Sequence, residues 1–459
     1  MTPLSAAFVA KITNGKVISG DSDIVMSGLS IDSRKLRSGD MFVAFEGASV
    51  DGHRFVLQAL SAGANGAIVT RPLDPDVSSN EKPIVLVENA LTAVQQLAVH
   101  ERAAFSGPVI GVTGSNGKTT TKDMIATVFS TGGACLSTEG NLNTELGLPL
   151  TLLRRVGTER SMVLEMGMRG LGQIAELCRI AQPSAGIITN IGQSHLELLG
   201  SQERIADAKG ELLEALPRDG VAALTFGDPW LERIQSRTKA RVFWYGLSDA
   251  ADAFASELES TERGTRFQAN VFGKSVAVDL PTRGQHNVIN ALGALLLGSV
   301  HELNLSDMAD ALHNLRASVG RLRVINGRSD RVLIDDCYNA SPLSMKASLG
   351  VLMEQAKGST TVAVLGDMFE LGSYERQGHL EVGAFCAEIG VDKVIAVGER
   401  AAWMAEGAKA AGHPHVEYFA SKSELLHHLE QVVPSHSTVL VKASRGMALE
   451  DVVAFLTRV

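Results

Sequence analysis

One stretch decides the fold: Val109-Ile-Gly-Val-Thr-Gly-Ser-Asn-Gly-Lys-Thr-Thr-Thr-Lys-Asp123. Its apolar start predicts a buried strand over residues 109–112, its two glycines predict a tight turn, and Thr119 onward is typical of the first turn of a helix. In such a layout the backbone N–H groups at the helix N-terminus point at an anion, Lys118 adds a positive charge and Thr119 can bind Mg²⁺. A Gly/Ser turn followed by a solvated lysine is the alternative, but the order of these residues favours a phosphate-binding loop.

This loop departs from the full pattern G-x-x-x-x-G-K-[ST], because Val112 occupies the position of the first glycine. The shorter form G-S-N-G-K-T remains, and it still supplies glycines, a lysine and a hydroxyl group for nucleotide binding. We therefore expect a nucleotide to bind here. The residues of the loop expected to bind it are Gly114, Ser115, Asn116, Gly117, Lys118, Thr119 and Thr120.

Length and composition limit the class of protein. A chain of 459 residues is too long for one ordinary core, so we expect two to four domains. A net charge of −9 argues against nucleic acid or an anionic membrane as the main partner. The four cysteines lie far apart in the sequence and lack the spacing of a metal site, a pattern typical of reduced thiols in a cytosolic protein. Because no signal-peptide profile is present and the longest apolar run, 291–300, is shorter than the ~18 residues of a membrane span, we expect a cytoplasmic protein without membrane insertion.

The pattern of strands and helices predicts an α/β protein of three domains. Residues 1–106 alternate short strands with helices, as expected of a small α/β domain. Residues 107–320 show repeated strand–helix units, which predict a mostly parallel sheet with helices on both faces, followed by a hairpin of exposed strands at 264–279. Residues 321–459 predict a Rossmann-like third domain that begins with a strand at 332–335. No G-x-G-x-x-G follows that strand, so no dinucleotide is expected there.

Three polar residues lie where ligands of a parallel sheet bind, beyond the carboxyl ends of its strands. Glu165 closes an apolar strand, where a carboxylate is costly to bury unless it is paired in a salt bridge or binds a metal. His195 follows a strand predicted at 184–189, where a lone histidine is usually a loop residue bonded to the backbone. Lys209 falls on the apolar face of a helix predicted over 202–216, where a lysine often buries its stem and keeps its amine in solvent.

Several motifs of the central domain resemble those of the Mur ligases. They are T-G-S-N-G-K-T-T at 113–120, N-I-G-Q-S-H-L-E at 190–197, A-D-A-K-G at 206–210 and H-N-V-I-N-A-L at 286–292. The resemblance implies that Lys209 is carbamylated and that it binds Mg²⁺ together with Thr119, Glu165 and His195; two ions are expected. It also implies that the nucleotide held by the loop is ATP, that Lys118, His195 and Lys209 act in catalysis, and that Asn290 contacts the adenine.

The first domain and one central loop resemble the parts of this family that bind a UDP-sugar. Residues 32–47 and 51–55 match D-S-R…G-D-x-F-V-A-x-x-G…D-G-H-x-F, which places Ser33 and Arg34 beside the nucleotide sugar. From composition alone the segment reads as a solvated edge with two turns. Residues 137–147 resemble the loop G-N-x-N-N-x-x-G, which borders the muramoyl-peptide, with a threonine where the last asparagine is usual. The residues expected to contact the substrate from this loop are Asn141, Asn143 and Thr144.

The junction to the third domain contains Arg321, a candidate for ATP binding and catalysis because an arginine from a second domain suits a transferring phosphate. Asp335-Asp-Cys-Tyr-Asn-Ala-Ser-Pro342 resembles D-D-x-Y-N-A-N-P of the Mur ligases that add a D,D-dipeptide, with a serine in place of the second asparagine. This likeness implies that Asp336 contacts the ribose and that Tyr338 faces the nucleotide. Residues 366–372 match G-D-M-x-E-L-G of the same group.

Taken together, the resemblance implies an ATP-dependent ligase of peptidoglycan synthesis. Its expected substrates are UDP-N-acetylmuramoyl-tripeptide and D-alanyl-D-alanine, joined through an acyl phosphate by a monomeric enzyme with no nucleic-acid partner. A neighbouring ligase is one alternative: an enzyme that adds diaminopimelate should carry D-N-P-R, which is absent, and a folylpolyglutamate synthase should lack the domain before the loop. A nucleotide-binding regulator is the alternative from another class, and ATP turnover independent of substrate would favour it.

Overall fold

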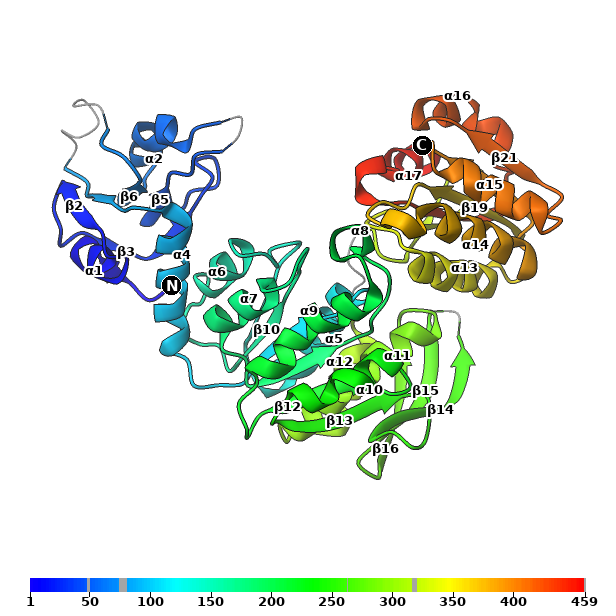
Figure 1. Cartoon of the computed structure of the whole chain (residues 1–459), viewed down its shortest axis with the longest axis horizontal. Helices are drawn as coiled ribbons and strands as arrows, with labels where there is room; N and C mark the ends of the chain where they lie inside the picture. Colours follow the sequence, from blue (N-terminus) through cyan, green and yellow to red (C-terminus); the bar gives the residue numbers. More distant parts are fainter. Residues whose placement is uncertain (48–49, 74–80, 262, 316–319, 458–459) are drawn as a thin grey trace.

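The computed structural model describes residues 1–47, 50–73, 81–261, 263–315 and 320–457. Three large sheets organise this part of the chain, and the units built on them follow one another from left to right in Figure 1. The central sheet has nine strands in the order β16-β15-β14-β13-β12-β11-β8-β10-β9; β15 alone runs in the opposite direction and pairs antiparallel with both β14 and β16. Its strands are β8 (Val109–Thr113), β9 (Cys135–Ser137), β10 (Ser161–Glu165), β11 (Ala185–Ile188), β12 (Val221–Thr225), β13 (Arg241–Gly246), β14 (Ala253–Ser260), β15 (Thr265–Val271) and β16 (Lys274–Leu280).

Helices cover both faces of the central sheet, which confirms the predicted α/β architecture. Along β10, Val163 belongs to the core on one face, whereas Met162 and Leu164 belong to the core on the other. Because both faces are buried, these strands are continuous apolar runs in the sequence. The helices on the Val163 side are α5 (Lys118–Phe129), α11 (Gln285–Val300) and α12 (Leu305–His313); those on the other side are α6 (Gly147–Leu152), α7 (Gln173–Ala181), α9 (Gln202–Ala215) and α10 (Pro229–Ile234).

The hairpin predicted at 264–279 is present as β15 and β16, but its description as exposed is wrong. Phe267 and Val278 are register partners and are both buried in the core beneath α11. Every second residue of β15 is buried, and in β16 Val278 and Leu280 are buried, so one face of the hairpin packs on the core and the other is open to solvent.

The N-terminal unit is a five-stranded sheet in the order β2-β7-β6-β5-β4, in which only the pair β2–β7 is antiparallel. Its last helix, α4 (Ala90–Ala103), packs against α6 and α7 of the central unit and shares a core with them. On α4, the buried carboxylate of Glu101 accepts hydrogen bonds from the backbone N of Thr2 at 2.9 Å and from Nη1 of Arg155 at 2.5 Å. The other elements of the unit are α1 (Ala6–Ile12), β2 (Lys16–Ser19), β4 (Gly28–Ser30), β5 (Asp40–Val43), η1 (Gly52–Phe55), α2 (Val56–Ser61), β6 (Gly66–Val69) and β7 (Ile84–Leu86), with β1 (Leu4–Ser5) paired to β3 (Val25–Met26).

A boundary at residue 106 therefore follows the sheets rather than the hydrophobic core, since α4 belongs to both units. The division at 106 and 320 stays a prediction.

The C-terminal unit is a six-stranded sheet in the order β17-β18-β22-β19-β20-β21. The prediction that it begins with the strand at 332–335 is wrong, because β17 (Arg323–Asn326) precedes that strand and pairs with it antiparallel. β17 is an edge strand with mostly exposed residues, so it lacks the apolar pattern that identified the others. The remaining elements are β18 (Val332–Asp336), α13 (Pro342–Ala356), β19 (Thr360–Gly366), η4 (Gly372–Tyr374), α14 (Glu375–Glu388), β20 (Lys393–Val397), α15 (Ala401–Ala410), β21 (Val416–Phe419), α16 (Lys422–Val432), β22 (Ser437–Lys442), η5 (Arg445–Met447) and α17 (Glu450–Thr457).

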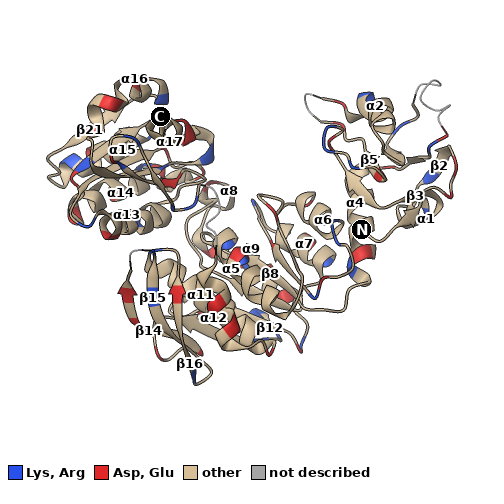
Figure 2. Cartoon of the chain, turned by 180° about the vertical axis from the view of Figure 1, so that it is seen from behind, with Lys and Arg blue, Asp and Glu red and all other residues tan. Residues whose placement is uncertain are grey.

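Basic and acidic residues are interspersed through all three units (Figure 2). Any anionic ligand must therefore be held by local groups rather than by a face of one charge. Among the described residues, every helix is too short or too polar to cross a membrane.

Candidate active site

A cavity of about 1180 Å³ is lined by residues of the central and C-terminal units. It brings together most of the residues that the sequence predicts for the site, although they come from distant parts of the chain. Gly114 is not part of its lining, and neither are Ser33 and Arg34 of the N-terminal unit. The predicted residues that do line it are Ser115, Asn116, Gly117, Lys118, Thr119, Thr120, Asn141, Asn143, Thr144, Glu165, His195, Lys209, Asn290, Arg321, Asp336 and Tyr338.

The loop between β8 and α5 has the backbone of a tight anion-binding turn. Gly114 has φ of +147°, and a Cβ atom there would lie 1.9 Å from Oγ1 of Thr189, so no other residue fits. Gly117 has φ of +79° and is the N-cap of α5. The loop is fixed from the end of β11, where Asn190 accepts from the N–H of Asn116 at 3.0 Å and donates to its carbonyl at 3.1 Å.

Lys118 lies at the centre of this loop. Its Nζ donates to the carbonyl oxygens of Gly114 at 2.8 Å and Ser115 at 3.3 Å. Burial lowers the pKa of the Lys118 amine, and the positive charge of Arg321 lowers it further, whereas Glu165 opposes the shift. An anionic phosphate beside this amine would restore the charged form.

Two oxygen-bearing side chains meet behind the loop. Oγ1 of Thr119 donates to Oε2 of Glu165 at 2.7 Å, and Nδ2 of Asn143 donates to Oε1 of the same carboxylate at 2.8 Å. Glu165 is 2% exposed and has no ion-pair partner among the described residues, which rules out the structural salt bridge considered from the sequence within that part of the chain. A buried carboxylate held this way has the donor chemistry of a Mg²⁺ site.

Lys209 lies on α9 and is 1% exposed, so it does not extend its amine to bulk solvent. Within the described residues its Nζ has neither a hydrogen bond nor an ion pair, although Lys209 lines the cavity. Burial holds the pKa of the Lys209 amine well below its usual value, and the charge of Lys118 adds to the effect. The unprotonated amine is therefore favoured, and this is the form that reacts with CO₂.

His195 precedes α8 (Leu196–Leu199) and has φ of +67°, a left-handed conformation that is uncommon for any residue but glycine. Its Nδ1 lies 2.6 Å from Oε2 of Glu370, which follows β19 in the C-terminal unit. The carboxylate of Glu370 therefore lies directly against one ring nitrogen of His195, across the boundary between the two units. The imidazole lowers the pKa of the Glu370 carboxyl below its usual value.

Comparisons with known proteins agree with this geometry. The family description "Mur ligase middle domain" matches residues 112–298, "Mur ligase, glutamate ligase domain" matches 320–445 and "Mur ligase family, catalytic domain" matches 25–102. A Bacillus subtilis protein named UDP-N-acetylmuramoyl-tripeptide–D-alanyl-D-alanine ligase is 40% identical over 432 residues, covering 94% of this chain and 93% of its own. The chain belongs to the Mur ligase family.

Solved structures of other Mur ligases are similar over nearly the full length. MurF from Acinetobacter baumannii superposes with a TM-score of 0.90 at 32% identity and 99% coverage of both chains. MurF ligase from Thermotoga maritima, solved in complex with ADP, has a TM-score of 0.81 at 30% identity and covers 94% of this chain and 96% of its own.

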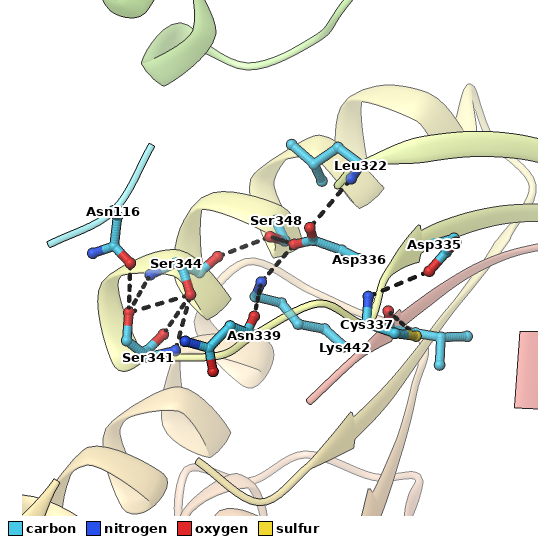
Figure 3. Close-up of polar contacts among 11 residues, drawn as sticks. Asn116, Leu322, Asp335, Asp336, Cys337, Asn339, Ser341, Ser344, Ser348 and Lys442 are labelled. Carbon is cyan, nitrogen blue, oxygen red and sulfur yellow. Dashed lines mark hydrogen bonds and ion pairs between the residues drawn. The ribbon is translucent and has the colours of Figure 1, made fainter. Parts of the chain in front are cut away.

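The C-terminal unit of this Mur ligase presents a buried polar network to the cavity (Figure 3). Oδ2 of Asp336 lies 2.6 Å from Nζ of Lys442 and accepts from Oγ of Ser348 at 2.6 Å, while Oδ1 accepts from the backbone N of Leu322 at 3.2 Å. Asp336 and Lys442 are register partners at the ends of the parallel strands β18 and β22. Lys442 was missed by the sequence reasoning, although a lysine that closes an apolar strand is the same signal that identified Glu165.

Two further contacts lie near the junction of the units: one between residues of the junction and the C-terminal unit, and one between the C-terminal and central units. The guanidinium of Arg321 lies 4.0 Å from the ring centroid of Tyr338, a cation–π contact that fixes both side chains. Oγ of Ser341, the N-cap of α13, donates to Oδ1 of Asn116 in the phosphate loop at 3.0 Å, as Figure 3 shows. Nδ2 of Asn116 is buried and has no hydrogen-bond partner among the residues that the structure describes.

The two residues predicted to contact the uridine part of the substrate lie in the loop after β4. Arg34 forms a two-point ion pair with Asp32, with Nε–Oδ1 and Nη2–Oδ2 distances of 2.9 Å. Hydrogen bonds from Arg34 lower the pKa of Asp32 to about 2. Arg34 is otherwise exposed, so its guanidinium stays accessible to a ligand of the N-terminal unit.

Proposed function

We propose that this Mur ligase joins D-alanyl-D-alanine to UDP-N-acetylmuramoyl-tripeptide with the conversion of ATP to ADP and phosphate. One observation carries the proposal: the phosphate loop, the carboxylate of Glu165 and the buried amine of Lys209 line the same cavity as residues of the C-terminal unit. The Bacillus subtilis relative bears this activity in its name, which supports the same pair of substrates. The product is UDP-N-acetylmuramoyl-pentapeptide, a precursor of peptidoglycan.

The chemistry explains why a nucleotide site and a second unit must share a cavity. A carboxylate is a poor electrophile, so the terminal carboxylate of the tripeptide first attacks the γ-phosphorus of ATP and ADP leaves. The amine of D-alanyl-D-alanine then attacks the acyl carbon and loses a proton. Phosphate departs with one oxygen from the original carboxylate, which accounts for every atom in the two steps.

The phosphate loop provides the cationic side of this reaction. Lys118 and the N–H groups at the start of α5 bind the β- and γ-phosphates, and Arg321 adds a planar guanidinium from the domain junction. Asn290 contacts the adenine, and its side chain lies beside the phosphate loop, where a Cβ atom added to Gly117 would be 3.3 Å from its amide. Asp336 contacts the ribose, and Tyr338 faces the nucleotide. The remaining residues of the phosphate loop also bind ATP.

Mg²⁺ fits the donor set of this cavity. The oxygens of Thr119 and Glu165 are of the type that this ion prefers, and His195 together with Lys209 as a carbamate would complete the ligands of two ions. The unpaired buried amine of Lys209 supports this arrangement, since it needs a chemical partner at the site. When bound, Mg²⁺ offsets the charge that accumulates between the carboxylate and the phosphates.

The UDP-substrate is assigned to two places. Ser33 and Arg34 of the N-terminal unit bind the nucleotide-sugar part, and Asn141, Asn143 and Thr144 border the muramoyl-peptide in the cavity. We further propose that the enzyme acts as a monomer in the cytoplasm, with small-molecule substrates and no nucleic-acid partner.

Replacing Arg321 tests the role of the domain junction. We expect Arg321→Ala to lower turnover by about 10²-fold, because a phosphate-binding group is lost from the reacting geometry. Binding of the UDP-substrate should be unchanged, since its uridine contacts lie in another unit. The control is Arg323→Ala, two residues away on the exposed face of β17. Calorimetry that showed lost UDP-substrate affinity at an unchanged saturated rate would contradict this placement.

The choice of amine tests the proposed function itself. Phosphate release should be measured with UDP-N-acetylmuramoyl-tripeptide and a panel of D-alanyl-D-alanine, diaminopimelate, lysine and glutamate. We expect release only with the dipeptide. Phosphate release with diaminopimelate or lysine but not with the dipeptide would instead favour a neighbouring ligase. Phosphate release without any amine or UDP-substrate would favour a nucleotide-binding regulator.

A further inference from the structure

Two loops from different units of the enzyme meet beside the cavity. One follows β11 and contains His195; the other follows β19 and contains Glu370. Besides the 2.6 Å contact between these side chains, the backbone N of Glu197 donates to the carbonyl of Glu370 at 3.2 Å. Gly372 has φ of +54°, and a Cβ atom there would lie 2.8 Å from Cα of Glu197, so the second loop docks directly on the first.

Both residues of this side-chain contact have strained backbones. His195 has φ of +67° and Glu370 has φ of +62°, although neither is a glycine. Such conformations persist only where the surroundings fix them, and they cluster at sites with a function. Two strained residues touch here across a domain boundary. This indicates that the position of their side chains is functionally important, although it costs conformational free energy in each loop.

The two ring nitrogens of His195 have different surroundings. The carboxylate of Glu370 faces Nδ1 of His195, which favours the tautomer with its proton on Nδ1. Nε2 is then the nitrogen with a free lone pair, and no described residue forms a hydrogen bond with it. A carboxylate on one imidazole nitrogen and a metal on the other is a recurrent arrangement, in which the carboxylate orients the ring and makes it a better ligand.

We propose that Glu370 is a positioning residue that holds His195 across the domain boundary, so that the metal site of the central unit is complete only when the C-terminal unit is docked. The proposal rests on the metal role proposed above for His195. It links domain docking to metal binding through one side-chain contact: when the units separate, His195 loses the group that orients it. The alternative is that this contact only holds the units together.

Metal affinity separates these two possibilities. Mn²⁺ alone is titrated into the full-length protein, and the free ion is counted by electron paramagnetic resonance for wild type, Glu370→Gln, Glu370→Ala, His195→Gln and the double variant Glu370→Gln/His195→Gln. Glu399→Gln is the matched control, because Glu399 is exposed in the same unit, outside the cavity lining, and has no hydrogen bond or ion pair among the described residues. Circular dichroism and thermal unfolding check that each variant is folded.

We expect Glu370→Gln and Glu370→Ala to weaken the Mn²⁺ site by about 10–100-fold, the usual effect of removing a carboxylate that orients a metal-binding histidine. The double variant should bind no more weakly than His195→Gln, because Glu370 acts through the histidine. Glu399→Gln should match wild type. If His195→Gln weakens binding while both Glu370 variants bind as wild type, the positioning role is wrong and the metal role of His195 stands. If His195→Gln has no effect, the metal assignment fails, and this inference fails with it.

Discussion

Lys118→Ala is expected to reduce ATP-dependent ligation by about 10³-fold or more, the scale seen when one cation is removed from a transferring phosphoryl group. The reason is local: Lys118 is the cation at the centre of the phosphate loop, and its amine is held against the carbonyl oxygens of that loop. The fold should survive, because the loop itself is fixed by Asn190 and by the geometry of Gly114.

The measurement combines ligation rate, ATP affinity by calorimetry and thermal unfolding. Lys239→Ala serves as the control, since Lys239 is exposed and lies outside the cavity lining. Near wild-type turnover of Lys118→Ala with unchanged ATP affinity would contradict the assignment of this loop to ATP.

Lys209→Ala should also lose about 10³-fold in turnover, because a ligand of the ions that neutralise the phosphates is removed. A protonated lysine would be poorly accommodated in this buried position beside Mg²⁺. As a carbamate, formed when the neutral amine attacks CO₂ and releases a proton, the same side chain provides oxygen ligands for a hard cation. Since burial lowers the pKa of Lys209, the neutral amine is more populated at neutral pH than in an exposed lysine. Carbamylation, and activity with it, should decline as the pH falls and the amine becomes protonated.

Chemical rescue distinguishes a lost carboxylate from a lost positive charge. A short carboxylic acid such as acetate should partly restore Lys209→Ala, whereas bicarbonate should not, because alanine has no amine to carbamylate. Labelling wild type with ¹³CO₂ should give a carbamate signal in the ¹³C spectrum that is absent from the variant. Active enzyme with both metals bound and an unmodified Lys209 ammonium paired to a carboxylate would contradict the carbamate.

The sequence predicted the central sheet because its strands are buried on both faces and end at glycines or polar residues. It also predicted that Glu165 and His195 approach the phosphate loop, since the carboxyl ends of parallel strands meet at one edge of a sheet. Lys209 could be found from its place on the apolar face of α9. These inferences need only local patterns and the rules of parallel sheets.

Other features depend on contacts that local patterns do not contain. The pairing of His195 with Glu370 follows from how two units dock, and the pairing of Asp336 with Lys442 joins strands 106 positions apart in the chain. β17 was missed because an exposed edge strand has no apolar run. The hairpin of β15 and β16 was described as exposed because alternation alone does not tell whether its apolar face meets a core.

One isotope measurement tests most directly whether this cavity catalyses ligation through an acyl phosphate. UDP-N-acetylmuramoyl-tripeptide carrying ¹⁸O in both oxygens of its reacting carboxylate is incubated with ATP and D-alanyl-D-alanine, and the products are analysed by mass spectrometry. We predict that one ¹⁸O appears in phosphate and that the other is retained in the new amide of the pentapeptide. Phosphate without ¹⁸O, or ATP consumption without pentapeptide, would contradict the proposed reaction.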